Sequence, residues 1–464
     1  MSTTEKEGLT KAGEVKIERI LLIAEGNNVI DLTEFLVEIN LFEDIFSNFM
    51  QGNIVLTDSR NLIEKFNLRG EESLIVKFRT PSFDPIHTIS KTFMTYKVSD
   101  RVIVRDNNTQ NFTIHFVSME MYLDTLLPLF ISFEGEVIDI VERIFTDYIS
   151  TNREYDVSDN SKEITQLEKL SPLLILNETS NKVKFVSPGW TPFKCINWLA
   201  SKAIPKDSKA KNFLFFETNK AFVFGSVEHL LREAVQNETS IGTYTIAASN
   251  IGTETDSKDV NRELFLAKDV EMVDSHDQIR NLTNGYIVNR LITLDIYNKV
   301  YDPIDYDHAQ EYKNQFHTSG SGPTSVPPFN PDTVRNPLVN ISFYPVNPRL
   351  FQKSASDYFK DNVSEKIGEI YGNRKSSLLE LNNIKMHLTV PGRTDIEVGR
   401  VLYFLYPSLD TKDSTDSTNP VQDKLYSGYY LITAINHKIN RHQHMMRMEI
   451  VKDSLLVDKN QTAA

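Results

Sequence analysis

Two segments of this chain carry the same succession of apolar, alternating runs. In the first, Gly70 precedes EESLIVKF, TYKVSDRVIV and NFTIHFVSME; in the second, Gly399 precedes RVLYFLYP, GYYLITAINH and HMMRMEIVKD. Alternation with a period of two is typical of strands that bury one face. Order, spacing and strand character agree while residue identity is low, so a chance match between β-rich segments is the competing interpretation. If the match is real, the chain carries two copies of one β-barrel.

Residues 15–118 predict a small antiparallel barrel or sandwich. Gly26, Asn27 and Asn28 separate two apolar runs, and Asp106–Asn108 separate two more. Residues of these types form tight turns between antiparallel strands. Several strands with almost no helix are typical of a first, tube-like antiparallel β-barrel over residues 15–118.

The hydrophobic period changes after residue 118. Val137, Ile140, Val141, Ile144 and Tyr148 recur at helical spacing, which predicts an amphipathic helix. A second helix follows, with Thr191 as N-cap and Pro192 at its first position. Two aromatic strands around residues 219–220 predict a hairpin. We therefore expect an α/β middle domain with an aromatic hairpin over residues 119–264.

The remaining residues predict a second barrel with an insertion. We assign residues 265–304 and 385–455 to the second tube-like β-barrel. Residues 305–384 form an inserted strap, rich in Ser, Gly and Pro, and a helical region. Residues 1–14 are expected to be a flexible arm and residues 456–464 a polar tail. The fold class is α+β and mainly β: two tube-like antiparallel β-barrel domains with α/β domains inserted between and within them.

Composition excludes several classes of protein. The 464 residues include 50 basic and 63 acidic ones, a net charge of −13, which argues against general nucleic-acid binding. One cysteine excludes an intrachain disulfide and a cysteine-based metal site. The polar N-terminus shows no secretory signal. The longest apolar runs, Ile20–Ala24 and Leu126–Ile131, are too short to be a membrane-spanning segment.

No motif for a phosphate-binding loop, a zinc protease or a serine nucleophile elbow is present. His437, His442 and His444 lie around a predicted hairpin tip, where alternate residues could share a metal ion. Neither a carboxylate nor a cysteine accompanies them, so we favour three solvated histidines near a polar turn.

Four other residues are candidates for a functional site. Glu217 and Asp295 are interpreted as solvated or interface residues rather than catalysts. Trp190 is interpreted as a packed aromatic at a helix entry rather than a sugar-stacking residue. Cys195 is interpreted as a small core residue rather than a nucleophile. We expect no catalytic, cofactor-binding or metal residue, no cofactor, and no enzymatic activity.

An ordered set of segments resembles one known family. GWTPFKCINWLA followed by FLFFETNKAFVFGSVEHLL, GNIVLTDSRNLIEKFNLRGEESLIVKFRTP, and LTVPGRTDIEVGRVLYFLYPS with SGYYLITAINHKI and EIVKDSL are similar to the central baseplate hub protein of contractile-tailed bacteriophages. The resemblance covers about residues 15–305 and 385–455. Residues 305–340 and 410–420 fit no pattern of that family.

The resemblance implies a non-enzymatic structural hub. Three copies form a ring, a homotrimer, in which two barrels per chain make six similar wall units. Such a ring adapts the sixfold tail tube to the threefold central spike and lets DNA pass without specific binding. Implied partners are a tail spike protein, a tail tube or tube-initiator protein, a tape-measure protein and baseplate wedge proteins. The implied location is the virion tail baseplate, after assembly in the host cytoplasm.

Two alternatives stay open. The hub of a contractile injection or secretion apparatus shares the fold; such hubs are often fused to a spike needle, and this sequence ends at Ala464 without one. A β-rich cell-wall or carbohydrate hydrolase belongs to another class and predicts a deep cleft lined by paired carboxylates.

Overall fold

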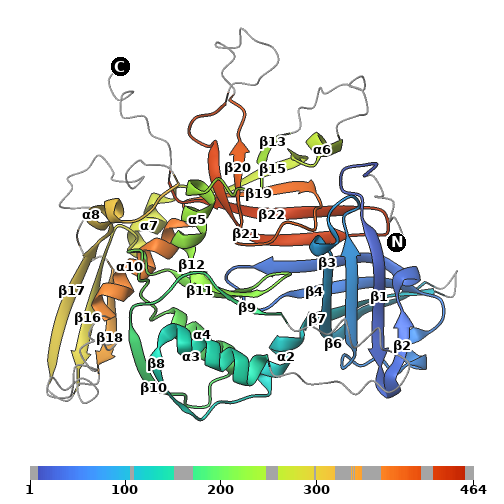
Figure 1. Cartoon of the computed structure of the whole chain (residues 1–464), viewed down its shortest axis with the longest axis horizontal. Coiled ribbons are helices and arrows are strands. Elements are labelled where there is room, and N and C mark those ends of the chain that lie inside the picture. Colours follow the sequence, from blue (N-terminus) through green and yellow to red (C-terminus); the bar gives the residue numbers. More distant parts are fainter. Residues whose placement is uncertain are drawn as a thin grey trace, which may run out of the picture.

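The computed structural model describes residues 9–104, 109–150, 171–246, 260–296, 299–318, 336, 338, 340–346, 367–408 and 422–454. Within them, one continuous sheet of 14 strands runs through the molecule (Figure 1). Its main path follows the order β14-β13-β20-β21-β3-β4-β7-β6-β5-β1-β2, and β15, β19 and β22 branch from β21. The chain is therefore mainly β, as the sequence predicted.

The first β unit is the run of strands from the N-terminal quarter, blue in Figure 1. It contains β1 (Lys16–Ala24), β2 (Asn28–Asp31), β3 (Leu36–Asp44), β4 (Gln51–Asp58), β5 (Ser73–Arg79), β6 (Ile89–Val104) and β7 (Thr109–Ser118), with the short helix α1 (Leu62–Lys65). The predicted hairpins β1–β2 and β6–β7 both form. In β7, Phe112, Ile114 and Phe116 are buried on one face, so the alternation in the sequence selects the core side.

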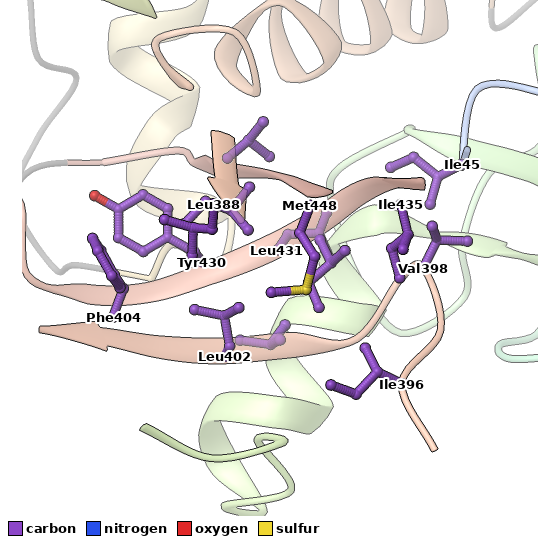
Figure 2. Packing of buried hydrophobic residues seen from close by; sticks show 14 of the residues in the cluster. Ile45, Leu388, Ile396, Val398, Leu402, Phe404, Tyr430, Leu431, Ile435 and Met448 are labelled. Carbon is purple, nitrogen blue, oxygen red and sulfur yellow. The ribbon is translucent and has the colours of Figure 1, made fainter. Parts of the chain in front are cut away.

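The second β unit is built from the C-terminal part of the chain. It contains β15 (Asp269–Ser275), β19 (Ile384–Pro391), β20 (Val401–Leu405), β21 (Gly428–Ile439) and β22 (His444–Lys452), extended by β13 (Thr243–Ile246) and β14 (Leu266–Ala267). Its core gathers side chains such as Leu388, Phe404, Tyr430, Leu431 and Met448 (Figure 2). The small helix α6 (Val260–Glu263) leads into β14.

The expected pair of closed barrels is not found among the described strands. The first β unit stays open, because β2 lies at one end of the sheet and β3 at the other end of that unit. The edge of β3 that does not pair with β4 pairs with β21 of the second β unit. Its backbone donors and acceptors are thus satisfied without closure.

The middle region, residues 119–242, packs helices against two small sheets and lies mostly below the second β unit in Figure 1. It contains α2 (Met119–Thr125), β8 (Ser132–Glu136), α3 (Val137–Ile144), β9 (Leu173–Ile175), β10 (Lys182–Val186), α4 (Pro192–Ala200), the predicted aromatic hairpin β11 (Phe213–Glu217) and β12 (Phe222–Ser226), and α5 (Val227–Gln236). Pro192 opens α4 as predicted, but Thr191 makes no side-chain cap bond. Asp124 accepts the hydrogen bond from the N–H of Phe193 at 2.7 Å instead.

The insertion differs from its expected division. Residues 265–304 do not all belong to the second β unit. Strand β15 joins that unit. Strands β16 (Val288–Asp295) and β17 (Val300–Asp307) instead form a separate three-stranded sheet with β18 (Ile341–Val346). Helix α10 (Ile367–Glu380) packs against β16 and β17. Gly368 and Gly372 of α10 allow this approach, since a Cβ there would meet Ile304 and Tyr306 at 2.4 and 2.5 Å. Helix α7 (Gln278–Asn284) precedes β16 in the chain, and helix α8 (His308–Glu311) follows β17. Among the described helices, none combines the length and apolar character needed to cross a bilayer.

Candidate functional site

The two β units repeat one pattern of strand pairing. The first follows β5-β6-β7-β4-β3 and the second follows β20-β21-β22-β19-β15, with every pair antiparallel. Each run begins just after a glycine with positive φ, Gly70 at 92° and Gly399 at 81°, a conformation that favours glycine. The repeat expected from the sequence is therefore present in the pairing of strands.

A bulge marks equivalent places in the two units. The β6–β7 register shifts between Thr95 and Lys97, and the β21–β22 register shifts between Ile432 and Ala434. Paired residues then form matching rows across the two units: Leu41–Gly52–Phe116–Thr95 and Met272–Met386–Ile450–Ile432. These rows give a residue-by-residue equivalence between the units.

The units meet where β21 pairs with β3. Residues 434–439 of β21 pair antiparallel with residues 44–39 of β3. Each unit also buries a side chain in the core of the other: Ile45 lies in the second core (Figure 2) and Ile439 in the first, both 0% exposed. Full burial of such a side chain contributes roughly 1.5–3 kcal/mol, so the joint is a packed interface rather than a linker.

A buried polar chain lies between the two cores. His437 Nδ1 is 3.0 Å from His444 Nε2, and His437 Nε2 is 3.2 Å from Glu43 Oε1. All three side chains are buried, whereas His442 is exposed at the hairpin tip. The expectation of three solvated histidines is thus wrong for His437 and His444. The reason is that β3, far away in sequence, covers the hairpin and supplies Glu43.

The two imidazole rings and the carboxylate form one hydrogen-bonded row. His437 Nε2 faces Glu43, and His437 Nδ1 faces His444 Nε2. Burial, and then the neighbouring His437, lower the pKa of His444 well below its usual value. A Cβ on Gly392 would lie 2.0 Å from the His444 ring, so only glycine leaves room for it. The hydrogen bonds among Glu43, His437 and His444 fix the register of β21 on β3. A slip by one residue would bury these polar groups without partners.

Two edges of the sheet have no strand partner among the described residues. One is the distal half of β6, residues 97–104, beyond its pairing with β5. Val102 and Ile103 there are 58% and 64% exposed. The other is the outer edge of β15, which pairs only with β19 and exposes 46% of Val273. Exposed apolar strand edges readily pair with another chain.

A second joint connects the first β unit to the middle region. Lys91 of β6 forms a buried ion pair with Glu217 at the end of β11, and donates to the carbonyl of Thr218 at 2.8 Å. Glu217 also accepts from the N–H of Met50 at 2.8 Å. Glu217 is therefore an interface residue, one of the two interpretations offered from sequence. Burial, and then the charge of Glu217, raise the pKa of nearby Glu120 to about 7.

The other three candidates lie apart from these joints. Asp295 is half-buried at the end of β16. Trp190 is half-buried, with its ring 6.1 Å from that of Trp198. Cys195 is fully buried beside Ser187, and burial raises the pKa of its thiol. Cys195 is thus the small core residue that the sequence predicted.

A hollow of about 370 Å³ lies over the joint of the units. Its lining includes Glu449 and Arg447, but Glu449 pairs with Lys385 at 3.1 Å and Arg447 with Glu271 at 2.8 Å. Asp44 also lines the hollow, and burial, with a smaller contribution from the charge of Glu449, raises the pKa of the Asp44 carboxyl. Within the described residues, one group of three potential metal ligands occurs elsewhere, His317 with Glu380 and Asp453.

Sequence reasoning missed Glu43, Lys91 and Glu120. A charged residue that breaks an apolar run, such as Glu43 in LVEINLFED or Lys91 in ISKTFM, was the available signal. It did not identify a partner, because the partners lie 394 and 126 residues away.

No protein-family model matches the sequence, and the search of curated proteins gave no match. The solved structure of a tail protein from Neisseria meningitidis MC58 matches with a TM-score of 0.50 at 9% identity, over 94% of this chain and 96% of that chain. A 43 kDa tail protein of prophage MuSo2 from Shewanella oneidensis gives 0.47 at 9% identity, over 94% of this chain and 98% of that one. An E. coli component of the type VI secretion system gives 0.42 at 9% identity, over 95% and 77%.

The Neisseria likeness extends over nearly the whole of both chains and includes both β units, the middle region and the insertion. At this low identity it is a statement about the fold. The chain therefore has the fold of a tail protein. This finding confirms, for the fold, the resemblance to phage baseplate proteins that its sequence shows.

Proposed function

We propose that this chain is a structural hub of a tail baseplate that assembles as a trimeric ring. Three chains with two similar units each would present six wall units, so the ring adapts a sixfold tail tube to a threefold spike. The observation that carries the proposal is the repeated strand pairing together with the β21–β3 joint. Each unit then acts as one wall segment of a tube.

The joint inside the chain supplies a template for the contact between chains. β21 of the second unit is equivalent to β6 of the first, and β3 of the first is equivalent to β15 of the second. Within the chain, β21 pairs with β3. The equivalent pair is β6 of one copy with β15 of the next, and these are the two open edges described above. A cyclic ring forms when this head-to-tail contact repeats and closes.

The equivalence predicts a register for this contact. Asn436 lies opposite Phe42 in the joint. Ser99 stands four residues after Thr95, as Asn436 does after Ile432. The register of β15 shifts between Met272 and Asp274, so Asp274, which pairs with Lys385 as Phe42 pairs with Gln51, is the equivalent of Phe42. Ser99 of one copy should therefore face Asp274 of its neighbour, with Cβ atoms roughly 4.5–5.5 Å apart.

The remaining roles follow from the ring. We propose that its two faces bind the tail tube or tube-initiator protein and the spike, that tape-measure and wedge proteins contact it, and that it is located in the virion tail. The net charge of −13 supports DNA passing a lumen to which its phosphates do not adhere. We also propose that the chain has no catalytic activity. Clearing of peptidoglycan in a zymogram, abolished by a single Asp or Glu substitution, would overturn that part.

Cysteine cross-linking tests the ring. The only native cysteine, Cys195, is fully buried, so Ser99→Cys with Asp274→Cys provides a clean pair. Oxidation, or a short bis-maleimide, should give covalent dimers and trimers on a denaturing gel. The series should end at three chains, because a closed ring has no further free edge.

The matched control combines Ser99→Cys with Tyr301→Cys, since Tyr301 is 68% exposed on the separate sheet of the insertion. This pair, and each single variant, should stay largely monomeric on the gel. Cross-linking no greater than the control, or a series that continues beyond three chains, contradicts the ring.

A further inference from the structure

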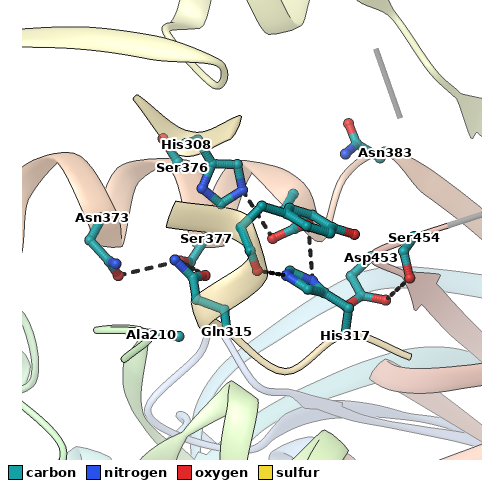
Figure 3. Close-up of polar contacts among 12 residues, drawn as sticks. Ala210, His308, Gln315, His317, Asn373, Ser376, Ser377, Asn383, Asp453 and Ser454 are labelled. Carbon is teal, nitrogen blue, oxygen red and sulfur yellow. Dashed lines mark hydrogen bonds and ion pairs between the residues drawn. The ribbon is translucent and has the colours of Figure 1, made fainter. Parts of the chain in front are cut away.

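Three potential metal ligands meet where the insertion joins the second β unit. His317 follows the short helix η5 (Tyr312–Asn314), Glu380 ends α10, and Asp453 follows β22. Their ligand atoms all lie within 4.8 Å of one another. Figure 3 shows His317 beside Asp453, next to α10. The three side chains are buried, with exposed fractions of 7%, 5% and 4%.

The polar atoms of this cluster are incompletely satisfied. His317 Nδ1 lies 3.2 Å from Asp453 Oδ2 and 3.4 Å from Glu380 Oε1. One imidazole nitrogen carries at most one proton, which cannot serve both carboxylates. Glu380 Oε1 has no hydrogen-bond partner among the described residues. A buried carboxylate oxygen without a partner is unfavourable, so the geometry calls for a cation.

Two of the three distances between the ligand atoms fit a tetrahedral metal ion. Zinc binds nitrogen and oxygen ligands at about 2.0–2.2 Å, which separates two ligands of a tetrahedron by about 3.4 Å. The two distances from His317 Nδ1 are close to this value. A divalent ion would also balance two carboxylates, whereas a protonated His317 leaves one negative charge over. Lys452, next to Asp453 in sequence, donates instead to the carbonyl of Ser427 at 2.8 Å.

The surrounding hydrogen bonds orient the ligands for a metal. His317 Nε2 donates to the carbonyl of Tyr312 at 2.9 Å, and the two rings stack 3.5 Å apart. With a metal ion bound, this bond selects the tautomer in which Nδ1 is the ligand atom. Asp453 accepts from the N–H of Thr318 at 3.2 Å and from Ser454 Oγ at 3.0 Å. Such outer contacts to histidine and carboxylate ligands are typical of metal sites.

We propose that His317 Nδ1, Glu380 and Asp453 bind a divalent transition-metal ion of the zinc type, with water as a fourth ligand. His308 Nε2 lies 3.5 Å from Glu380 Oε2 and acts as a positioning residue for that carboxylate. By binding all three ligands, the ion links α10 and the segment after η5 to the end of β22 in the second β unit. This inference concerns a single chain and does not rest on the ring.

The test uses the full chain, stripped with a chelator and titrated with Zn²⁺ by calorimetry. We expect one ion per chain and a rise in the thermal midpoint on binding. Glu380→Gln should weaken binding by at least about 100-fold, more than the 10- to 100-fold typical of outer-contact losses, and should abolish the thermal shift. Co²⁺ bound to the native chain should give the intense visible absorption of a tetrahedral site.

His387→Gln is the matched control, because His387 lies at the surface 3.5 Å from Glu271 and 3.6 Å from Glu449. It should leave Zn²⁺ binding unchanged. No binding by the native chain, or equal binding by Glu380→Gln, would show that His317 holds only a proton and would overturn the proposal. If Glu380→Gln does not fold, the Co²⁺ spectrum of the native chain decides: weak octahedral absorption contradicts the site.

Discussion

At the scale of single residues, the buried ion pair of Lys91 and Glu217 has the largest expected effect. Their side chains are 8% and 0% exposed. Lys91→Met leaves the Glu217 carboxylate buried without its cation and should lower the free energy of unfolding by about 3–5 kcal/mol. The double variant Lys91→Met, Glu217→Gln removes both charges and should lower it by clearly less than the sum of the single variants. Denaturant unfolding of all four proteins measures this, and additive losses would contradict the pairing.

The buried carboxyl group of Glu120 should make the free energy of unfolding depend on pH. Its pKa rises from an ordinary 4.5 to about 7 in the folded chain, so the folded state binds more protons than the unfolded state between these values. The stability it contributes is complete below pH 4.5 and is lost as pH rises through 7. Glu120→Gln should therefore stabilise the chain by roughly 1–3 kcal/mol at pH 8 and change little at pH 4.5. Unfolding at both values checks this, and an equal effect at the two would contradict it.

His437 and Glu217 also show what sequence reasoning could not reach. The residue types and the local turn were identified correctly, but the environment of each side chain depends on a strand or hairpin distant in the chain. Glu43, the partner of His437, lies on β3, and Lys91, the partner of Glu217, lies on β6. The hydrophobic periodicity near each residue does not predict either pair. Cys195 was predicted well because its surroundings, an amphipathic helix, are local.

At the scale of elements, the two glycines that precede the repeated strands make a matched pair. Both have positive φ, but a Cβ on Gly70 would lie 2.7 Å from the backbone carbon of Tyr96, whereas on Gly399 it would lie 3.2 Å from the Phe216 ring. Gly399→Ala should lower the free energy of unfolding by about 1–2 kcal/mol from the backbone alone. Gly70→Ala should lower it by about 2–4 kcal/mol, because overpacking against a backbone adds to the strain.

Thermal and denaturant unfolding of both alanine variants compares them directly. Equal losses would mean that the contact with Tyr96 relaxes and that only the backbone conformation matters.

Elements were predicted where their signals are local. Alternation identified the strands of both units, and helical spacing identified α3. The assignment of residues 288–302 failed to anticipate β18 as their partner, because a hairpin with alternating residues fits any sheet edge. The parallel pairing of β16 with β18 joins segments about fifty residues apart, and no periodicity within either segment specifies it.

At the scale of the whole molecule, the repeat connects the fold to the proposed assembly. A single chain already contains one copy of the contact that the ring needs, the β21–β3 joint. Its equivalent edges, the distal half of β6 and the outer edge of β15, have no strand partner within the described part of the chain. The sequence predicted the repeat from strand order. It did not predict that the units would join into one sheet, because that depends on β3 pairing with β21 rather than closing its own unit.

Electron cryomicroscopy of the assembled protein is the decisive test of the proposed ring. We expect a closed ring of three chains with six similar wall segments, in which β6 of each chain pairs with β15 of the next. A ring with another number of chains, or three chains whose β6 and β15 edges lie apart, would contradict it.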